Sequence, residues 1–193
     1  MKYDFAVIGA GPAGNVAAKK AASAGKKVLL VEKSKLGGVC LNEGCVPSKT
    51  LLQAAKTYHH AKHGSIFGVE AEGLTFDFPK AHEHKNNVMN KMRDGIAGLM
   101  KKYKVDVVEG EAKLLPNSQV EINGETHEAT DILLCTGSSP AIPPIPGVDL
   151  ENVVDSSGIL IRETLPNHLV VVGGGVIGCE FACMYASVGV PVT

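Results

Sequence analysis

The chain has 193 residues, of which 45% are hydrophobic and 20% charged, so its composition is that of a globular protein and excludes disorder as the main state. Its formal net charge is -1, which gives no electrostatic reason to bind nucleic acid or acidic lipid. We therefore expect a small or neutral partner, with no nucleic acid and no membrane.

The N-terminus, MKYDFAVIGAG, enters an apolar strand-like run without the pattern of a secretory signal peptide. The cysteines number five, which is odd, and they do not resemble the disulfide framework of a secreted protein; they stand at 40, 45, 135, 179 and 183. We expect a cytoplasmic location, where a close cysteine pair is more often catalytic or metal-binding.

One pattern occurs twice along the chain. FAVIGAGPAGNVAAKKAASAGKKV matches LVVVGGGVIGCEFACMYASVGVPV at a constant offset of 164 residues (173 − 9). Each copy predicts a buried strand, a G-x-G-x-x-G turn, a helix of small residues and a second strand. The paired glycines are Gly9 with Gly173, Gly11 with Gly175, and Gly14 with Gly178.

The glycine spacing indicates a dinucleotide-binding turn. The first glycine permits the bend, the second lets the backbone approach a pyrophosphate, and the third lets the helix pack on the strand. In the first copy, the strand VLLVEK places Glu32 18 residues after Gly14 (32 − 14), where an acid would bind a ribose hydroxyl. Residues 169–192 are apolar enough to suggest a membrane span, but their glycines favour a strand and a helix.

In the second copy, the counterpart of Glu32 would lie beyond Thr193. We therefore expect the chain to be the N-terminal part of a longer protein, and to be incomplete and inactive as an enzyme by itself.

The middle of the chain predicts helices beginning near Pro47 and covering residues 81–102, the second with Met89, Met92, Ile96 and Leu99 facing the core. VDVVEG predicts a strand, QVEINGETHEAT a hairpin with a type I′ turn at Asn-Gly, and DILLCTG a further buried strand. The proline-rich stretch SSPAIPPIPGVD indicates a boundary, giving domains 1–147 and 148–193.

The stretch GGVCLNEGCVPSKTLL contains Cys40 and Cys45. A disulfide closing so short a loop would stabilise the fold by only about 2 kcal/mol. Zinc would need two more ligands, and no second close pair lies in a loop. Redox chemistry is favoured, because a helix N-terminus and Lys49 would both stabilise a Cys45 thiolate.

Other metal-ligating side chains favour simpler interpretations. His59, His60 and His63, and the pair His82 and His84, are best explained as a solvated polar face. Cys179 and Cys183, four residues apart in the second small-residue helix, are expected to be compact packing residues. We expect no metal site.

GGVCLNEGCVPSK resembles the redox-active signature of the pyridine nucleotide-disulfide oxidoreductases, and is most similar to the branch that acts on dihydrolipoamide. The resemblance covers the whole chain, through both glycine fingerprints and the Thr136-Gly137 turn. It implies an α/β fold, with a Rossmann-like FAD-binding domain followed by the beginning of a second Rossmann-like NAD(P)-binding domain.

The resemblance also implies roles for particular residues. Cys40 would be the interchange thiol attacked by substrate, Cys45 the thiol beside the flavin, and Lys49 a flavin neighbour paired with Glu180, which we expect as a buried ion pair. The implied FAD-binding residues are Gly9, Gly11, Gly14, Glu32, Lys33, Gly38, Lys49, Ala112, Thr136 and Gly137, and the implied NAD-binding residues are Gly173, Gly175 and Gly178. Val39 and Cys135 depart from the usual Thr and Ala, which puts local hydrogen bonding in doubt.

The implied reaction passes electrons from dihydrolipoamide through a Cys40–Cys45 disulfide and FAD to NAD. The implied partners are a lipoyl domain of a 2-oxoacid dehydrogenase or glycine cleavage complex, and a second copy in a homodimer. Two alternatives stay open: an NADPH-dependent enzyme like glutathione or mercuric reductase, and a non-catalytic flavin-binding module or redox sensor.

Overall fold

The computed structural model describes all 193 residues, which form two compact units, each built from two stretches of chain. The first unit comprises Met1–Asn42 and Asn90–Ser139, and the second comprises Glu43–Met89 and Pro140–Thr193. The units do not follow the expected domains 1–147 and 148–193, because residues 43–89 pack with the helix of the second glycine fingerprint. The division into FAD-binding and NAD-binding domains stays a prediction.

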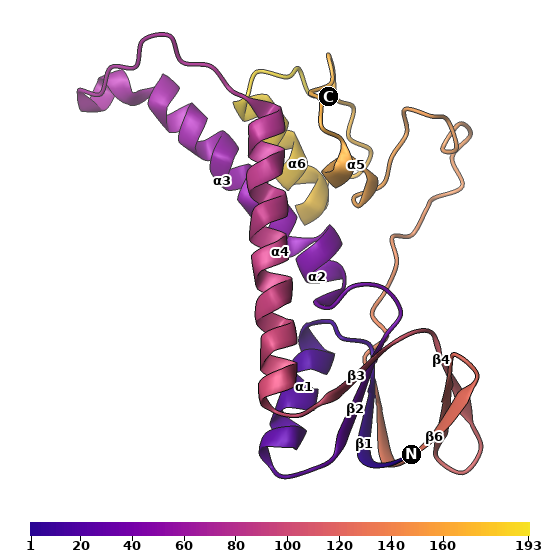
Figure 1. The fold of residues 1–193 in the computed structure, drawn as a ribbon. Coiled ribbons are helices and arrows are strands. Elements are labelled where there is room, and N and C mark those ends of the chain that lie inside the picture. The colour runs from indigo at the N-terminus through magenta and orange to yellow at the C-terminus, as the bar shows by residue number, and fades with distance from the viewer. The chain divides into compact units, whose positions relative to one another are not determined.

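A six-stranded sheet forms the first unit, in the order β3-β2-β1-β6-β5-β4 (Figure 1). Strands β3, β2, β1 and β6 run parallel, whereas β4, β5 and β6 form an antiparallel edge. The expected Rossmann-like α/β architecture is confirmed. The strands are β1 (Lys2–Ile8), β2 (Val28–Glu32), β3 (Asp106–Glu109), β4 (Ala112–Leu115), β5 (Gln119–Ile122) and β6 (Glu125–Leu134).

Both faces of this sheet are covered, which explains why residues 5–8 of β1 and residues 28–31 of β2 are continuously apolar. Helix α1 (Pro12–Ser23) packs against one face, as Figure 1 shows, in a cluster made by Val7, Ala10, Ala18, Val28, Leu30, Met100 and Val105. The alternate residues form a second cluster with the hairpin, made by Tyr3, Ala6, Ile8, Leu29, Val31, Val120, Ile122 and Ala129. This packing fixes the carboxyl ends of β1 and β2, where the first glycine turn begins.

The predicted hairpin is confirmed, since Asn123 and Gly124 both have positive φ, 52° and 83°, as a type I′ turn requires. The separate strand expected over DILL is wrong, because these residues continue β6 as one ten-residue strand whose last residue, Leu134, is exposed. Strand β4 was not predicted.

The second unit is mainly helical and contains α3 (Cys45–Lys62), the first part of α4 (Phe78–Lys102), α5 (Gly158–Ile161) and α6 (Val176–Ser187), with a short 3-10 helix, Gly64–Phe67. Its core consists of Leu51, Ala55, Phe78, Ile159, Leu160, Phe181, Met184, Tyr185 and Val190. The two helices predicted in the middle of the chain are confirmed, each starting two or three residues earlier than expected.

Two expectations fail here. The strands of the second glycine copy are reduced to one isolated parallel bridge between Leu169 and Val192. The core-facing stripe on α4 is wrong for Met92 and Leu99, which are 46% and 40% exposed. The buried residues of α4 are Phe78, His82, Lys85 and Met100, and Met92 and Leu99 lie at one edge of the same side of the helix.

His82 and Lys85 form a buried polar pair in the second unit. The Lys85 ammonium donates to the Leu160 carbonyl at 2.6 Å and lies 3.3 Å from Nδ1 of His82. Burial, followed by the Lys85 charge, lowers the pKa of His82 to about 4, against an opposing effect of Glu163. Burial likewise lowers the pKa of Lys85.

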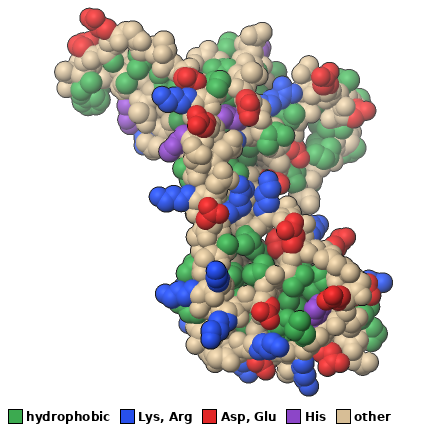
Figure 2. Space-filling model, viewed as in Figure 1, with side chains coloured by type: hydrophobic (Ala, Val, Ile, Leu, Met, Phe, Trp, Pro, Cys, Tyr) green, Lys and Arg blue, Asp and Glu red, His purple; other side chains and the backbone are tan.

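No helix of the chain combines the length and apolar character needed to cross a membrane. On the face drawn in Figure 2, acidic and basic side chains are interspersed. This mixed pattern is in keeping with the small formal net charge.

Candidate functional site

The first glycine turn is built so that only glycine fits at two of its positions. A Cβ on Gly14 would lie 1.8 Å from the carbonyl oxygen of Gly9, and Gly9 itself has a φ of +100°. Helix α1 follows with Pro12 in its first turn and Gly11 as an N-cap that has no side-chain hydrogen bond. The first N–H groups of α1 are therefore left for a ligand, as a pyrophosphate site requires.

Glu32 ends β2 beside this turn. Its carboxylate accepts hydrogen bonds from the backbone N–H of Ala10 at 2.8 Å and of Ser34 at 3.0 Å. These bonds hold the carboxylate against the glycine turn, so the acid expected to bind a ribose lies next to the expected pyrophosphate site. Lys33, which follows, is exposed.

Three further predicted residues lie at the same edge of the sheet. Gly38 lies so close to the turn that a Cβ on it would be 2.6 Å from Cα of Gly11. Thr136 and Gly137 follow β6, whose extension brings the N–H of Cys135 to the carbonyl of Ile8 at 2.7 Å. The carboxyl ends of adjacent parallel strands thus bring these residues together, as expected for a ligand site at such an edge.

Ala112 lies farther along this edge, at the start of β4. The preceding Gly110 donates its N–H to the carbonyl of Glu32 at 2.9 Å, which joins the β3–β4 connection to the end of β2. The first glycine turn, the N–H groups at the start of α1 and the adjacent Glu32 carboxylate together fit a dinucleotide such as FAD.

The second glycine turn repeats this local design within the second unit. A Cβ on Gly178 would lie 2.2 Å from the carbonyl oxygen of Gly173. Gly175 is the N-cap of α6, again without a side-chain hydrogen bond. The backbone at this turn therefore also suits a phosphate group, as a second dinucleotide site would require.

The two predicted redox cysteines lie on different helices. Cys40 is half-buried in α2 (Gly38–Glu43), which belongs to the first unit. Cys45 is the first residue of α3, and it is exposed in the second unit. Cys45 therefore lies at the N-terminus of α3, where the first backbone N–H groups of the helix have no partner within the helix.

Lys49, one turn after Cys45, forms a salt bridge with Glu180 of α6. The predicted pairing of these residues is confirmed. The expectation that the pair is buried is wrong, because the Lys49 side chain is 60% exposed and that of Glu180 27%. The pair therefore presents charge at a surface that also carries Cys45.

A groove of about 810 Å³ lies within the second unit, with a mostly apolar lining. Cys45 and Lys49 belong to it, together with Val46, Thr50, Gln53, Ala54 and Thr57 of α3 and His84 and Val88 of α4. From Cys45 to Thr57 the helix rises roughly 18 Å, at about 1.5 Å per residue. The groove thus offers space for an elongated, mainly apolar group that reaches the Cys45 thiol.

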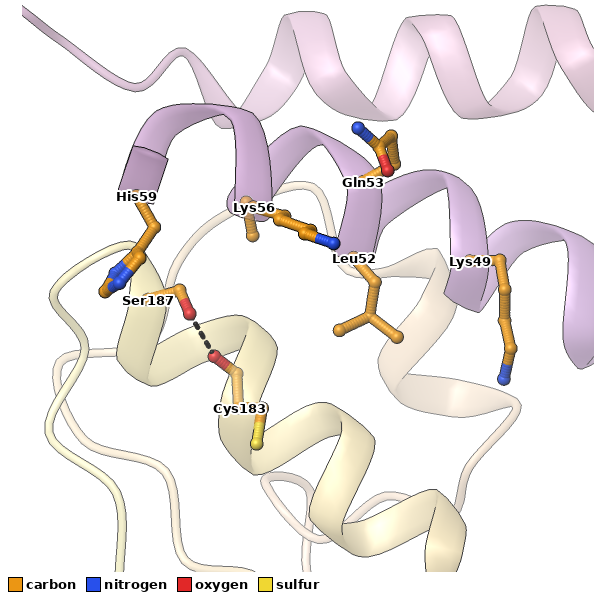
Figure 3. A pocket seen from close by; sticks show the side chains of 8 residues that line it. Lys49, Leu52, Gln53, Lys56, His59, Cys183 and Ser187 are labelled. Atoms are coloured by element: carbon orange, nitrogen blue, oxygen red, sulfur yellow. Dashed lines mark hydrogen bonds between the residues drawn. The ribbon is translucent and has the colours of Figure 1, made fainter. Parts of the chain in front are cut away.

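A smaller pocket of about 350 Å³ is lined by residues of α3 and α6 (Figure 3). His59 and Ser187 lie at one end and Lys49 at the other, with the Cys183 thiol between them. Cys179 and Cys183 are exposed, so the interpretation of both as packing residues is wrong. No group of three or more His, Cys, Asp or Glu side chains is arranged to hold a metal ion.

Sequence reasoning missed one contact of the cysteine motif. Arg93 of α4 donates to Oδ1 of Asn42, which lies between the two cysteines. The position of Asn42 inside the cysteine motif could have marked Asn42 as a site residue. Nothing in the sequence around Arg93 indicated that Arg93 would contact Asn42, which lies 51 residues away.

A family model described as pyridine nucleotide-disulphide oxidoreductase matches residues 3–193. The chain is 46% identical to a dihydrolipoyl dehydrogenase of Bacillus subtilis, over 98% of this chain and 41% of that protein. It is 41% identical to a dihydrolipoyl dehydrogenase of Chlamydia pneumoniae, over 100% of this chain and 42% of that protein.

A solved structure agrees with these matches. The Cu(II) complex of the HOCl-induced flavoprotein disulfide reductase of Escherichia coli superposes with a TM-score of 0.86 at 34% identity, covering 100% of this chain and 42% of that chain. The chain thus spans about two fifths of the length of these relatives. It belongs to the pyridine nucleotide-disulphide oxidoreductase family.

Proposed function

We propose that this chain supplies the FAD-binding and redox-disulfide part of a dihydrolipoyl dehydrogenase, which oxidises dihydrolipoamide and passes the electrons to NAD. The observation that carries the proposal is the position of Cys45 at the start of α3, beside the Lys49–Glu180 pair and at an apolar groove. The names of the relatives support the same reaction.

In the proposed reaction, one thiolate of dihydrolipoamide attacks Sγ of Cys40 in a Cys40–Cys45 disulfide. The bond between the two cysteines breaks, and Cys45 leaves as a thiolate at the start of α3. The second substrate thiol then attacks the mixed disulfide, which releases Cys40 and closes the lipoamide ring. The substrate loses two electrons and two protons; the cysteine pair gains the two electrons, and the protons pass to the released cysteine sulfurs or to solvent.

The proposed cofactor sites use the two glycine turns. The N–H groups at the start of α1 would bind the FAD pyrophosphate, and Glu32 would bind its ribose, with Lys33, Gly38, Lys49, Ala112, Thr136 and Gly137 as further contacts. The turn at Gly173, Gly175 and Gly178 would bind NAD. FAD, when bound, supplies the two-electron acceptor that connects the cysteine pair to NAD.

The groove beside Cys45 suits a substrate carried on an aliphatic arm, since its lining is mostly apolar. We therefore propose, as physiological partner, a lipoyl domain of a 2-oxoacid dehydrogenase or glycine cleavage complex, with action as a homodimer in the cytoplasm. The salt bridge between Lys49 and Glu180 would hold the Lys49 ammonium in place one turn after Cys45.

The test is NADH formation from dihydrolipoamide with added FAD, measured on the complete natural polypeptide that carries these residues. We expect activity in the wild type and its loss in both Cys40→Ser and Cys45→Ser. Reduction of glutathione disulfide by NADPH, without dihydrolipoamide oxidation, would instead assign the rival reductase function. Flavin binding without either activity would indicate a non-catalytic module.

A further inference from the structure

Asn42 is the most extensively hydrogen-bonded side chain of the cysteine motif. Its Nδ2 group donates to the carbonyl of Gly38 at 2.9 Å and of Leu36 at 3.1 Å, with Lys35 at 3.4 Å. These carbonyls belong to the turn that leads into α2. The amide therefore closes the turn onto the helix that carries Cys40.

The other end of the same amide is held by Arg93. Nη1 of Arg93 donates to Oδ1 of Asn42 at 2.7 Å, and its Nη2 donates to Oδ1 of Asn90, one turn earlier on α4. The surrounding groups agree with this orientation of the Asn42 amide. Turning the amide by 180° would point its NH₂ group at the guanidinium, which has only donors, and its oxygen at three carbonyls, which are only acceptors. The second bond of Arg93 fixes its own side chain, so Asn42 meets a partner that is already positioned.

Helix α2 needs such an anchor because it is very short. It has six residues, whereas isolated helices shorter than roughly 12 residues are marginal in water. Leu41 is the only residue of α2 that is buried, so few side-chain contacts fix the rotation of the helix. A hydrogen bond at the next residue, about 100° farther round the helix, restricts that rotation.

The anchor also reaches the first glycine turn. Gly38, which accepts from Asn42, packs against Gly11, and the N–H of Gly37 donates to the carbonyl of Ala10 at 2.9 Å. Arg93, Asn42 and the pyrophosphate turn are thus joined by consecutive contacts within the first unit.

We propose that Arg93 is a positioning residue for Cys40. Through Asn42, its guanidinium sets the rotation and the register of α2 against the glycine turn, and so the direction from which a thiol reaches Cys40. The proposal rests on the proposed function in one respect, that Cys40 is the thiol that exchanges with substrate. Near-attack geometry in thiol–disulfide exchange is sensitive to such orientation.

The main test compares two activities of the complete natural polypeptide. For Arg93→Met, we expect kcat/KM for dihydrolipoamide to fall about tenfold, since a charge-assisted hydrogen bond and a helix anchor are lost. NADH-dependent reduction of ferricyanide, which takes electrons from the flavin without the cysteines, should stay within about twofold. Lys91→Met, an exposed change on the same helix, is the matched control and should leave both activities unchanged.

A second variant separates orientation from charge. Arg93→Gln keeps an N–H donor for Asn42 but carries no charge, and we expect it to recover most of the loss. A parallel fall of both activities in Arg93→Met, or unchanged dihydrolipoamide oxidation, would overturn the positioning role.

Amide hydrogen exchange of the complete natural polypeptide tests the inference independently of the proposed function. Arg93→Met should speed exchange in α2, with little change in β1 and β2, whereas Lys91→Met should not. A wild type that does not oxidise dihydrolipoamide would refute the proposed function, and the exchange result would still decide whether Arg93 holds α2. Unchanged exchange in α2 would refute the anchor itself.

Discussion

Lys49 of α3 and Glu180 of α6 form a salt bridge across 131 residues of sequence. The helices that carry them pack against each other around Leu51 and Phe181, which share one apolar cluster. Packing of these apolar side chains, and not the ion pair, therefore accounts for most of the attachment of α6 to α3.

The exposure of this pair predicts a small effect on stability. Exposed ion pairs typically contribute about 0.2 to 1 kcal/mol, so Glu180→Gln and Lys49→Met should each change the free energy of unfolding by no more than about 1 kcal/mol. Urea unfolding of the two single variants and the double variant measures their coupling energy. A coupling above about 2 kcal/mol would show that the pair behaves as a buried one.

Replacing glycine by alanine should be harmful at one position of the chain and stabilising at another. Gly14→Ala should abolish FAD binding, because the new Cβ would lie 1.8 Å from the carbonyl oxygen of Gly9. Gly95→Ala, inside α4 with no atom within 4 Å of the new Cβ, should stabilise the chain by about 0.5 to 1 kcal/mol. Flavin fluorescence quenching and urea unfolding measure the two effects. FAD bound by Gly14→Ala with wild-type affinity would exclude the first turn as its site.

Local sequence patterns predicted the elements that depend on local chemistry. The β1–α1–β2 unit, the Asn123-Gly124 turn and the helices α3, α4 and α6 all follow from apolar periodicity and glycine placement. The Lys49–Glu180 contact was reached through family resemblance. Neither source indicated the Arg93–Asn42 bond or the burial of Lys85, because both depend on which distant segment packs beside α4.

The same limit explains the failed prediction for α4. Met92 and Leu99 lie at one edge of the side of α4 that carries the buried residues, and helical spacing alone cannot say how wide a strip of that side another segment covers. In the structure, the buried side of α4 includes two polar residues, His82 and Lys85, whose partners come from α5 and from α4 itself.

The apolar groove predicts a size-dependent block of substrate access. Ala54→Trp, placed between Cys45 and Thr57 in the groove lining, should lower the rate of disulfide exchange with dihydrolipoamide at least tenfold. His60→Trp, exposed on the same helix outside this groove, is the matched control. Stopped-flow thiol exchange measures both variants. Equal rates in Ala54→Trp and the wild type would exclude the groove as the approach to the cysteines.

The buried His82 predicts a loss of stability in mild acid. Its pKa is about 4 in the folded chain, below the ordinary value of 6.5, because burial and Lys85 disfavour the charged imidazole. Below pH 6.5 the unfolded chain binds a proton that the folded chain refuses until about pH 4, so the free energy of unfolding falls as the pH falls through this range. One proton contributes a slope of at most about 1.4 kcal/mol per pH unit. Above pH 6.5 the contribution is fully present.

The measurement is urea unfolding of the 193-residue chain at pH steps between 7.5 and about 4, in comparison with two variants. His82→Asn keeps an acceptor for Lys85 but does not titrate, so its unfolding free energy should lose this part of the pH slope. His84→Gln removes an exposed histidine two residues away and should keep the wild-type slope, which separates a buried imidazole from a solvated one. The carboxylates are the same in all three proteins, so their contributions cancel in the differences. Parallel profiles for the wild type and His82→Asn would mean that the imidazole protonates equally well in the folded and unfolded chains. The surroundings of His82, which include Phe78 and Lys85, would then open in solution.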